Sequence, residues 1–217
     1  MKLRLDILPP PQLILWPQLQ SIPQEFVLYG GTAIALQLGH RKSVDFDFFS
    51  SLPLNKEKLI SNIPFLTNAK LVHPEINTLN CNILIDHEYV KLQFLAGIGN
   101  RQGRVDELLK CKDNGIQIAS LRDLLASKLN TIQLRPEIKD YIDIDAIINH
   151  GISLATGLGC AQAIFGSKFD YGTSLRALCS YRDGDLNQLP TDIKKRLTKA
   201  AIAIDTIPLI HPISKTI

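Results

Sequence analysis

Two aspartates, Asp45 and Asp47, stand at alternate positions of a short apolar run. In a β-strand, residues i and i+2 project from one face, so we expect the carboxylates side by side. Val44, Phe46 and Phe48 are then expected to face a core. Adjacent carboxylates repel one another, and a divalent cation relieves that repulsion. Oxygen ligands favour a hard ion, so the pair predicts a site for Mg²⁺ or Mn²⁺.

A candidate phosphate-binding turn precedes this pair. Gly30 and Gly31 follow an apolar run, and a helix is expected from Thr32. Glycine lets the backbone approach a ligand closely, and helix N-terminal amides bind anions. Ser43 is expected on the strand face of the carboxylates. We expect nucleotide phosphates to be held by Gly30, Gly31, Thr32 and Ser43, although Thr32 could equally be an ordinary N-cap. Glycine turns and Asp-x-Asp pairs are each common, but together they form the arrangement that metal-dependent nucleotidyl transfer requires.

The elements that must position these residues fall into two stretches. Strand-like segments with short helices between them predict a small mixed sheet domain in residues 1–115, and a helical domain is expected in residues 116–217, with helical periodicity from Ser120 onward. Ser120 is a candidate N-cap with Asp123 at the capping-box position. The fold class predicted is therefore α+β. The expected strands are 26–29, 44–49, 69–74, 78–86 and 88–96, and the expected helices are 12–20, 32–38, 54–63, 120–132, 136–149, 153–165, 174–181 and 190–204.

The stretch from Gly30 to Phe49 resembles the first motif of the nucleotidyltransferase superfamily, which has a DNA polymerase β-like fold. More narrowly, it resembles the AbiEii family of nucleotidyltransferase toxins from abortive-infection and toxin–antitoxin systems. That family's pattern is Gly-Gly-Thr-Ala, a short helix, and His-Arg-x-Ser-x-Asp-x-Asp-Phe-Phe, and the chain contains all of it. A second block is similar to the family's helical motif, and a third runs from Phe165 to Pro190. The second block consists of Asp123, Lys128, Arg135 and Lys139-Asp140-Tyr141-Ile142-Asp143.

The resemblance implies a nucleotidyltransferase sheet domain and a C-terminal all-helical domain, with the active cleft between them. It implies transfer of a nucleoside monophosphate from an NTP, with tRNA or another RNA as acceptor in some members and an antitoxin as partner. Lys128 would offset triphosphate charge, and Asp140 is favoured over Asp143 as a site residue. Arg41 is either a phosphate clamp or a solvated turn residue.

The chain departs from polymerase β-like enzymes at one position. Such enzymes often carry a third carboxylate on the strand beside the Asp pair, and that position here holds Gln93. Glutamine cannot accept a proton as a base. Asp86, Glu88 or Asp106 could substitute from a turn. The alternatives are one-metal chemistry, a base from elsewhere, or a fold that binds a nucleotide or partner without catalysis. Transfer to a protein or small molecule is a further alternative.

Composition sets broad limits. The 217 residues are 45% hydrophobic, carry a formal net charge of +3 and include 4 cysteines without a CxxC pair. These values predict a globular protein in a reducing compartment and no structural zinc. No apolar run reaches the ~18 residues of a membrane span, and no signal peptide is evident. We therefore expect a cytoplasmic protein without a membrane partner.

Overall fold

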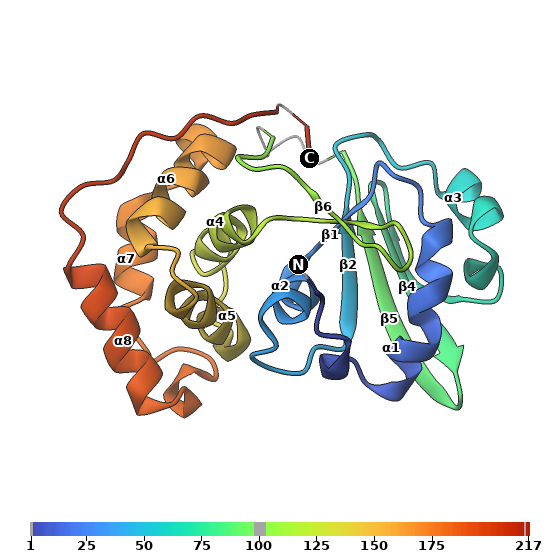
Figure 1. Cartoon of the computed structure of the whole chain (residues 1–217), viewed down its shortest axis with the longest axis horizontal. Helices are drawn as coiled ribbons and strands as arrows, with labels where there is room; N and C mark the ends of the chain where they lie inside the picture. The colour runs from blue at the N-terminus through green and yellow to red at the C-terminus, as the bar shows by residue number, and fades with distance from the viewer. Residues whose placement is uncertain (1, 98–102, 215) are drawn as a thin grey trace. The chain divides into compact units, whose positions relative to one another are not determined.

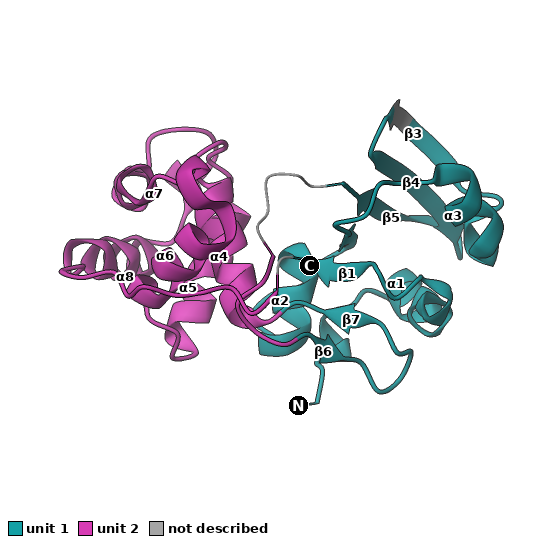
Figure 2. Ribbon diagram, turned by 90° about the horizontal axis from the view of Figure 1, so that it is seen from above, with its two compact units in different colours: residues 1–101, 108–119, 216–217 teal, residues 102–107, 120–215 magenta. Residues whose placement is uncertain are grey.

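A computed structural model describes residues 2–97, 103–214 and 216–217 (Figure 1). The chain divides into two compact units, each assembled from segments that are distant in sequence (Figure 2). Unit 1 comprises residues 1–101, 108–119 and 216–217, and unit 2 comprises residues 102–107 and 120–215. Within the described ranges, no helix has the length and apolar character needed to cross a lipid bilayer.

Unit 1 is built on a mixed sheet whose seven described strands lie in the order β3-β4-β5-β2-β1-β7-β6. Strand β2 is central, antiparallel to β1 and parallel to β5, so both of its backbone edges are hydrogen-bonded. The strands are β1 (Val27–Tyr29), β2 (Asp45–Phe49), β3 (Lys70–Glu75), β4 (Thr78–Ile85), β5 (Glu88–Leu95), β6 (Leu109–Lys110) and β7 (Gln117–Ile118).

One face of this sheet is the hydrophobic core of unit 1. Phe46, Phe48 and Phe94 are fully buried there, and the rings of Phe48 and Phe94 stack with centroids 5.5 Å apart. Helix α1 (Pro10–Leu15) packs against β4 and β5 on this side (Figure 1). Trp16 approaches Phe46 from the following turn. The apolar positions of β2 therefore fix which face its polar positions occupy. The remaining helices of unit 1 are η1 (Leu5–Ile7), η2 (Trp16–Ser21), α2 (Gly30–Leu38), α3 (Lys56–Asn62) and η3 (Pro64–Leu66).

Strands β4 and β5 form a long hairpin closed by Asp86 and His87. Both residues have positive φ, 47° and 67°, as a two-residue turn matching the twist of its strands requires. The turn predicted at Asp86, His87 and Glu88 is present, but Glu88 already belongs to β5.

Unit 2 is helical, as predicted from the periodicity after residue 120. Gly157 of α6 permits close packing on α4, because a Cβ there would lie 2.5 Å from Leu125 Cδ2. Ser120 caps α4 by accepting from the amide of Asp123 at 3.1 Å, which confirms the predicted N-cap. The helices are α4 (Leu121–Thr131), α5 (Ile138–Asn149), α6 (Leu154–Phe165), η4 (Gly166–Lys168), α7 (Tyr171–Ala177), η5 (Leu186–Gln188) and α8 (Thr191–Ile202).

Several predicted positions were wrong. Val44 is 52% exposed and precedes β2, so it does not join the core. The helix expected over 12–20 changes to a 3₁₀ turn at Trp16, where Pro17 follows and lacks an amide hydrogen. The helix expected over 174–181 begins earlier, at Tyr171, because Asp170 caps it by accepting from the amide of Gly172. It also ends earlier than expected, at Ala177.

Candidate active site

Asp45 and Asp47 project together from the polar face of β2. Both are half-buried, whereas the intervening Phe46 and the following Phe48 are fully buried on the opposite face. The alternation that predicted this arrangement is therefore present in the structure.

The turn from β1 into α2 lies directly beside Asp47. Gly30 has φ +71°, and a Cβ on it would lie only 2.3 Å from Asp47 Oδ2. Glycine is thus required twice, once for the backbone conformation and once for the room that the carboxylate occupies. Helix α2 begins at Gly30, two residues earlier than expected at Thr32. The first-turn amides, including that of Gly31, have no partner within the helix, and such amides are the kind of donor that binds anions in other proteins.

Thr32 and Ser43 tie α2 to the segment before β2. Thr32 is 1% exposed and Ser43 7% exposed. Their hydroxyl oxygens are hydrogen-bonded at 2.8 Å, and the Thr32 hydroxyl also donates to the carbonyl of Asp45. Ser43 precedes β2, so the expectation that it shares the strand face of Asp45 was wrong. The two hydroxyls thereby fix the position of the strand that carries the carboxylates.

The next strand contributes Lys91 and Gln93 to the same face. In the parallel pairing of β2 with β5, Lys91 lies opposite Asp45 and Gln93 opposite Asp47. Lys91 Nζ is 3.9 Å from Asp45 Oδ2. Gln93 therefore does occupy the position beside the Asp pair, and its neighbour on that face is a cation.

The donor set of this face fits one hard divalent cation. Mg²⁺ is commonly held by one or two carboxylates together with substrate phosphates, which the paired aspartates and the adjacent amides can accommodate. Among the described residues, no group of three or more His, Cys, Asp or Glu side chains is placed to hold a metal without substrate. A metal ion bound at this face would be held by Asp45 and Asp47 together with oxygens of the substrate.

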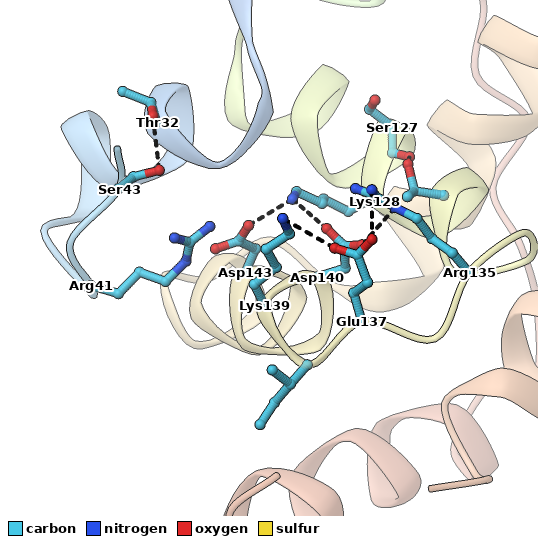
Figure 3. Close-up of polar contacts among 12 residues, drawn as sticks. Thr32, Arg41, Ser43, Ser127, Lys128, Arg135, Glu137, Lys139, Asp140 and Asp143 are labelled. Atoms are coloured by element: carbon cyan, nitrogen blue, oxygen red, sulfur yellow. Dashed lines mark hydrogen bonds and ion pairs between the residues drawn. The ribbon is translucent and has the colours of Figure 1, made fainter. Parts of the chain in front are cut away.

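Unit 2 holds a buried ionic cluster of Lys128, Asp140 and Asp143 (Figure 3). Lys128 Nζ lies 2.6 Å from Asp140 Oδ1 and 2.7 Å from Asp143 Oδ2. Lys128 is 7% exposed, and both aspartates are fully buried. They lie three residues apart on α5, so both reach the lysine at the end of α4.

The oppositely charged side chains of this cluster attract one another. Burial lowers the pKa of Lys128, but attraction to Asp143 and Asp140 outweighs burial and raises the pKa above its ordinary value. The lysine is therefore a cation at neutral pH, and it forms ion pairs with both carboxylates. Arg135 Nε lies 3.5 Å from Asp140 Oδ2.

The first turn of α5 is fixed by residues from both sides. Glu137 pairs with Arg135 at 2.7 Å and with Lys139 at 3.1 Å (Figure 3). Asp185 caps the helix by accepting from the amide of Ile138 at 2.8 Å. The Asp-Gly-Asp segment after α7 thus positions the carboxylates of α5.

The remaining candidate residues come from the turn before β2, from unit 2 and from the β4–β5 hairpin. Arg41 lies in the turn between α2 and β2 and donates to the carbonyl of Lys42 at 3.0 Å. Asp106 belongs to unit 2 and pairs with Arg122 at 2.9 Å. Asp86 lies in the β4–β5 turn, and Glu88 starts β5. Neither belongs to the Asp45–Lys91 and Asp47–Gln93 pairs.

The chain belongs to the AbiEii nucleotidyltransferase toxin family of type IV toxin–antitoxin systems, whose family profile matches residues 18–205. The resemblance of the three sequence blocks is thereby confirmed. An uncharacterized protein of Aquifex aeolicus (strain VF5) is 31% identical over 126 residues, which are 57% of this chain and 58% of that protein's length.

Solved structures share the fold, which confirms the predicted nucleotidyltransferase α+β class. A putative nucleotidyltransferase from H. pylori superposes with a TM-score of 0.57 and 16% identity, covering 88% of this chain and 91% of that one. MenT4, a nucleotidyltransferase toxin from Mycobacterium tuberculosis H37Rv, gives 0.58 and 13%, covering 88% and 81%. An antigenic nucleotidyltransferase-like protein from Paracoccidioides brasiliensis gives 0.54 and 17%, covering 89% and 91%.

Sequence reasoning missed two residues that shape the site, Lys91 and Asp185. The alternation of β5 placed Lys91 and Gln93 on one face, but only the β2–β5 register puts the lysine beside Asp45. Asp185 lies 47 residues from the helix that it caps, so no local pattern connects them.

Proposed function

We propose that this protein transfers a nucleoside monophosphate from an NTP to an RNA acceptor and acts as the toxin of a toxin–antitoxin pair. The observation that carries the proposal is the contact between the glycine turn and the carboxylates. The space beside Gly30 is filled by Asp47, so a triphosphate on the α2 amides would lie next to the Asp pair. Membership of the AbiEii family supports both the reaction and the toxin role.

The proposed reaction is attack of an acceptor hydroxyl on the α-phosphorus. A new P–O bond forms, the bond to the bridging oxygen breaks, and pyrophosphate leaves while the hydroxyl proton passes to solvent. Asp45 and Asp47 would hold Mg²⁺ or Mn²⁺, which neutralises charge on the phosphates when bound. The amides of Gly30 and Gly31 would bind the triphosphate. Thr32 and Ser43 support the site by holding the strand in place, because their hydroxyls are buried and bonded to one another.

The cluster in unit 2 is proposed to serve the reaction as a positioning element. The family resemblance assigns Lys128 to the triphosphate, and Asp140 to the site. Two carboxylates at 2.6 and 2.7 Å already balance the lysine charge, which favours a supporting role for Lys128. Arg41 is the arginine proposed to reach the phosphates directly, whereas Arg135 is paired with Glu137 and Asp140.

A second candidate function is nucleotide binding without turnover. Gln93 beside Asp47 favours it, because the amide supplies neither a base nor a charge for a second metal. The two candidates differ in whether pyrophosphate appears.

The test is transfer of label from each α-³²P-labelled NTP to bulk RNA, with pyrophosphate release measured in parallel. We expect the wild type to label RNA in Mg²⁺ and the Asp45→Asn and Asp47→Asn variants to lose at least about 100-fold in rate. Asp113→Asn, an exposed acid in the same unit, is the matched control and should leave the rate unchanged. Label on protein or on a small molecule would identify a different acceptor, and no pyrophosphate with any NTP would refute the transferase.

The toxin role is tested by induced expression in a bacterial host. We expect the wild type to arrest growth and Asp45→Asn to be harmless at equal protein level. Co-expression of the neighbouring reading frame should restore growth if it encodes the antitoxin. Growth arrest by the Asp45→Asn variant would separate toxicity from nucleotidyl transfer.

A further inference from the structure

The polar face of the sheet continues past the Asp pair onto β5, β4 and β3. Cross-strand pairing gives two rows on this face, one from Asp47 through Gln93 to Asn80, the other from Asp45 through Lys91 to Asn82 and Lys70. A third pair, Tyr89 opposite Leu84, lies one step further along the hairpin. We call this surface the β4–β5 face; its residues are Lys70, Asn80, Asn82, Leu84, Tyr89, Lys91 and Gln93.

Large side chains of the β4–β5 face are exposed to solvent, and packing of the core does not require this. Tyr89 is 61% exposed and Leu84 58% exposed, and the Lys91 side chain is 52% exposed. The same strands bury Val90 and Leu92 on their other side, so the core is complete without the tyrosine. Asn80 Oδ1 is buried and has no hydrogen-bond partner among the residues that the structure describes.

The geometry of in-line transfer decides which substrate reaches this face. The attacking and leaving oxygens lie on opposite sides of the α-phosphorus. The leaving pyrophosphate belongs with the amides of α2, which follow β1, on one side of β2. The acceptor must then approach over the opposite neighbour of β2, which is β5. From the strand spacing and rise, Tyr89 lies on the order of 8 Å from Asp45, within reach of an acceptor held at the carboxylates.

We propose that the β4–β5 face binds the single-stranded end of the RNA acceptor, an inference that rests on the proposed function. Tyr89 stacks on a base, with Leu84 beside it. Lys91 and Lys70 pair with backbone phosphates. The amides of Asn80, Asn82 and Gln93 both donate and accept hydrogen bonds, as base edges and a ribose 2′-hydroxyl require.

The composition of the face favours a nucleic acid strand over a protein. Its charged members are the lysines Lys70 and Lys91, which complement phosphates. Its large exposed apolar side chains are Tyr89 and Leu84, and a half-buried Val72 lies opposite Asn80; together they are too small for the core of a stable protein interface. A polyanion with flat bases matches both features.

The direct test is fluorescence anisotropy with a labelled single-stranded RNA, without NTP or divalent metal. We expect Tyr89→Ala to weaken RNA affinity roughly 5- to 150-fold, as for one stacked base. Tyr89→Trp should retain affinity. Lys91→Gln should reduce the slope of log affinity against log salt by about one contact. Tyr171→Ala, which removes a tyrosine 52% exposed on α7, and Lys110→Gln, on β6, are matched controls that should change neither quantity.

A second measurement separates this inference from the proposed function. Where RNA is the acceptor, Tyr89→Ala should raise the KM for RNA and leave the KM for NTP unchanged. Loss of RNA binding in Tyr89→Ala would support the inference even if no transfer were detected. Equal RNA affinity in Tyr89→Ala and Tyr171→Ala would overturn it while transfer persisted. It would also be overturned if the wild type bound double-stranded RNA as tightly as single-stranded RNA. The same holds if Tyr89→Ala weakened binding of an antitoxin protein and left RNA affinity unchanged. Thermal unfolding should show that all variants are folded, because substitutions at exposed positions usually change the free energy of unfolding little.

Discussion

Replacing Lys128 by methionine tests whether the buried cluster of unit 2 is structural. The substitution keeps an unbranched side chain of similar length, so packing between α4 and α5 changes little. It leaves Asp140 and Asp143 fully buried without the cation that now lies 2.6 and 2.7 Å away.

The expected loss follows from that geometry. Removing one partner of a buried ion pair costs about 3–5 kcal/mol, because an uncompensated charge stays in the interior. Arg135, half-exposed and 3.5 Å from Asp140, compensates only part of it. A domain has about 5–15 kcal/mol of stability in all, so Lys128→Met should leave unit 2 barely stable. At about 2–4 °C per kcal/mol, the melting temperature should fall by roughly 6–20 °C.

The assay is urea unfolding followed by circular dichroism, with Lys195→Met as control. Lys195 is exposed on α8, so its replacement should change the free energy of unfolding by less than about 0.5 kcal/mol. A triple variant, Lys128→Met with Asp140→Asn and Asp143→Asn, removes the buried charges together. It should recover most of the lost stability, because a neutral interior does not carry the desolvation cost.

One result would refute this account of the cluster. If Lys128→Met unfolded within about 1 kcal/mol of the wild type and still lost all transfer activity, the lysine would act on the triphosphate itself. Activity that returned in the triple variant together with stability would instead establish Lys128 as a positioning residue.

Three further predictions concern the same two sites. Gly30→Ala should abolish nucleotide binding and destabilise the protein more than Gly115→Ala. Both glycines have φ above +70°, but only at Gly30 would the added Cβ lie 2.3 Å from Asp47 Oδ2. Unfolding curves and NTP titrations of the two variants check this. Thr32→Val should cost about 1–3 kcal/mol in urea unfolding, because it leaves buried partners unsatisfied; normal stability with lost NTP affinity would show that the hydroxyl binds phosphate. Because folding raises the pKa of Lys128, its charge stabilises the folded state fully at pH values below the ordinary lysine pKa of 10.5. This contribution disappears as the pH rises through the higher pKa of the folded state. Wild-type stability should therefore fall in strongly alkaline buffer, and an unfolding series showing the same fall in Lys128→Met would contradict that assignment.

Much of the fold and of the site around Asp45 and Asp47 follows from local sequence. The alternation of Asp45 and Asp47 with buried phenylalanines determines their common face, and Gly30 marks a backbone conformation open to few other residues. Ser120 and Asp123 define a helix start through contacts three residues apart. Each of these features depends on residues close in sequence, so a pattern suffices to predict it.

The tertiary structure decided what no local pattern contains. Thr32 and Ser43 have the residue types of phosphate ligands, yet the packing of α2 on β2 buries their hydroxyls against each other. The register of β2 on β5 sets Lys91 beside Asp45 and Gln93 beside Asp47. Register depends on the pairing of strands 46 residues apart, and a shift of one residue would send every side chain to the other face. The sequence by itself predicted which residues have side chains suited to the proposed chemistry, while long-range packing determined which of them lie side by side.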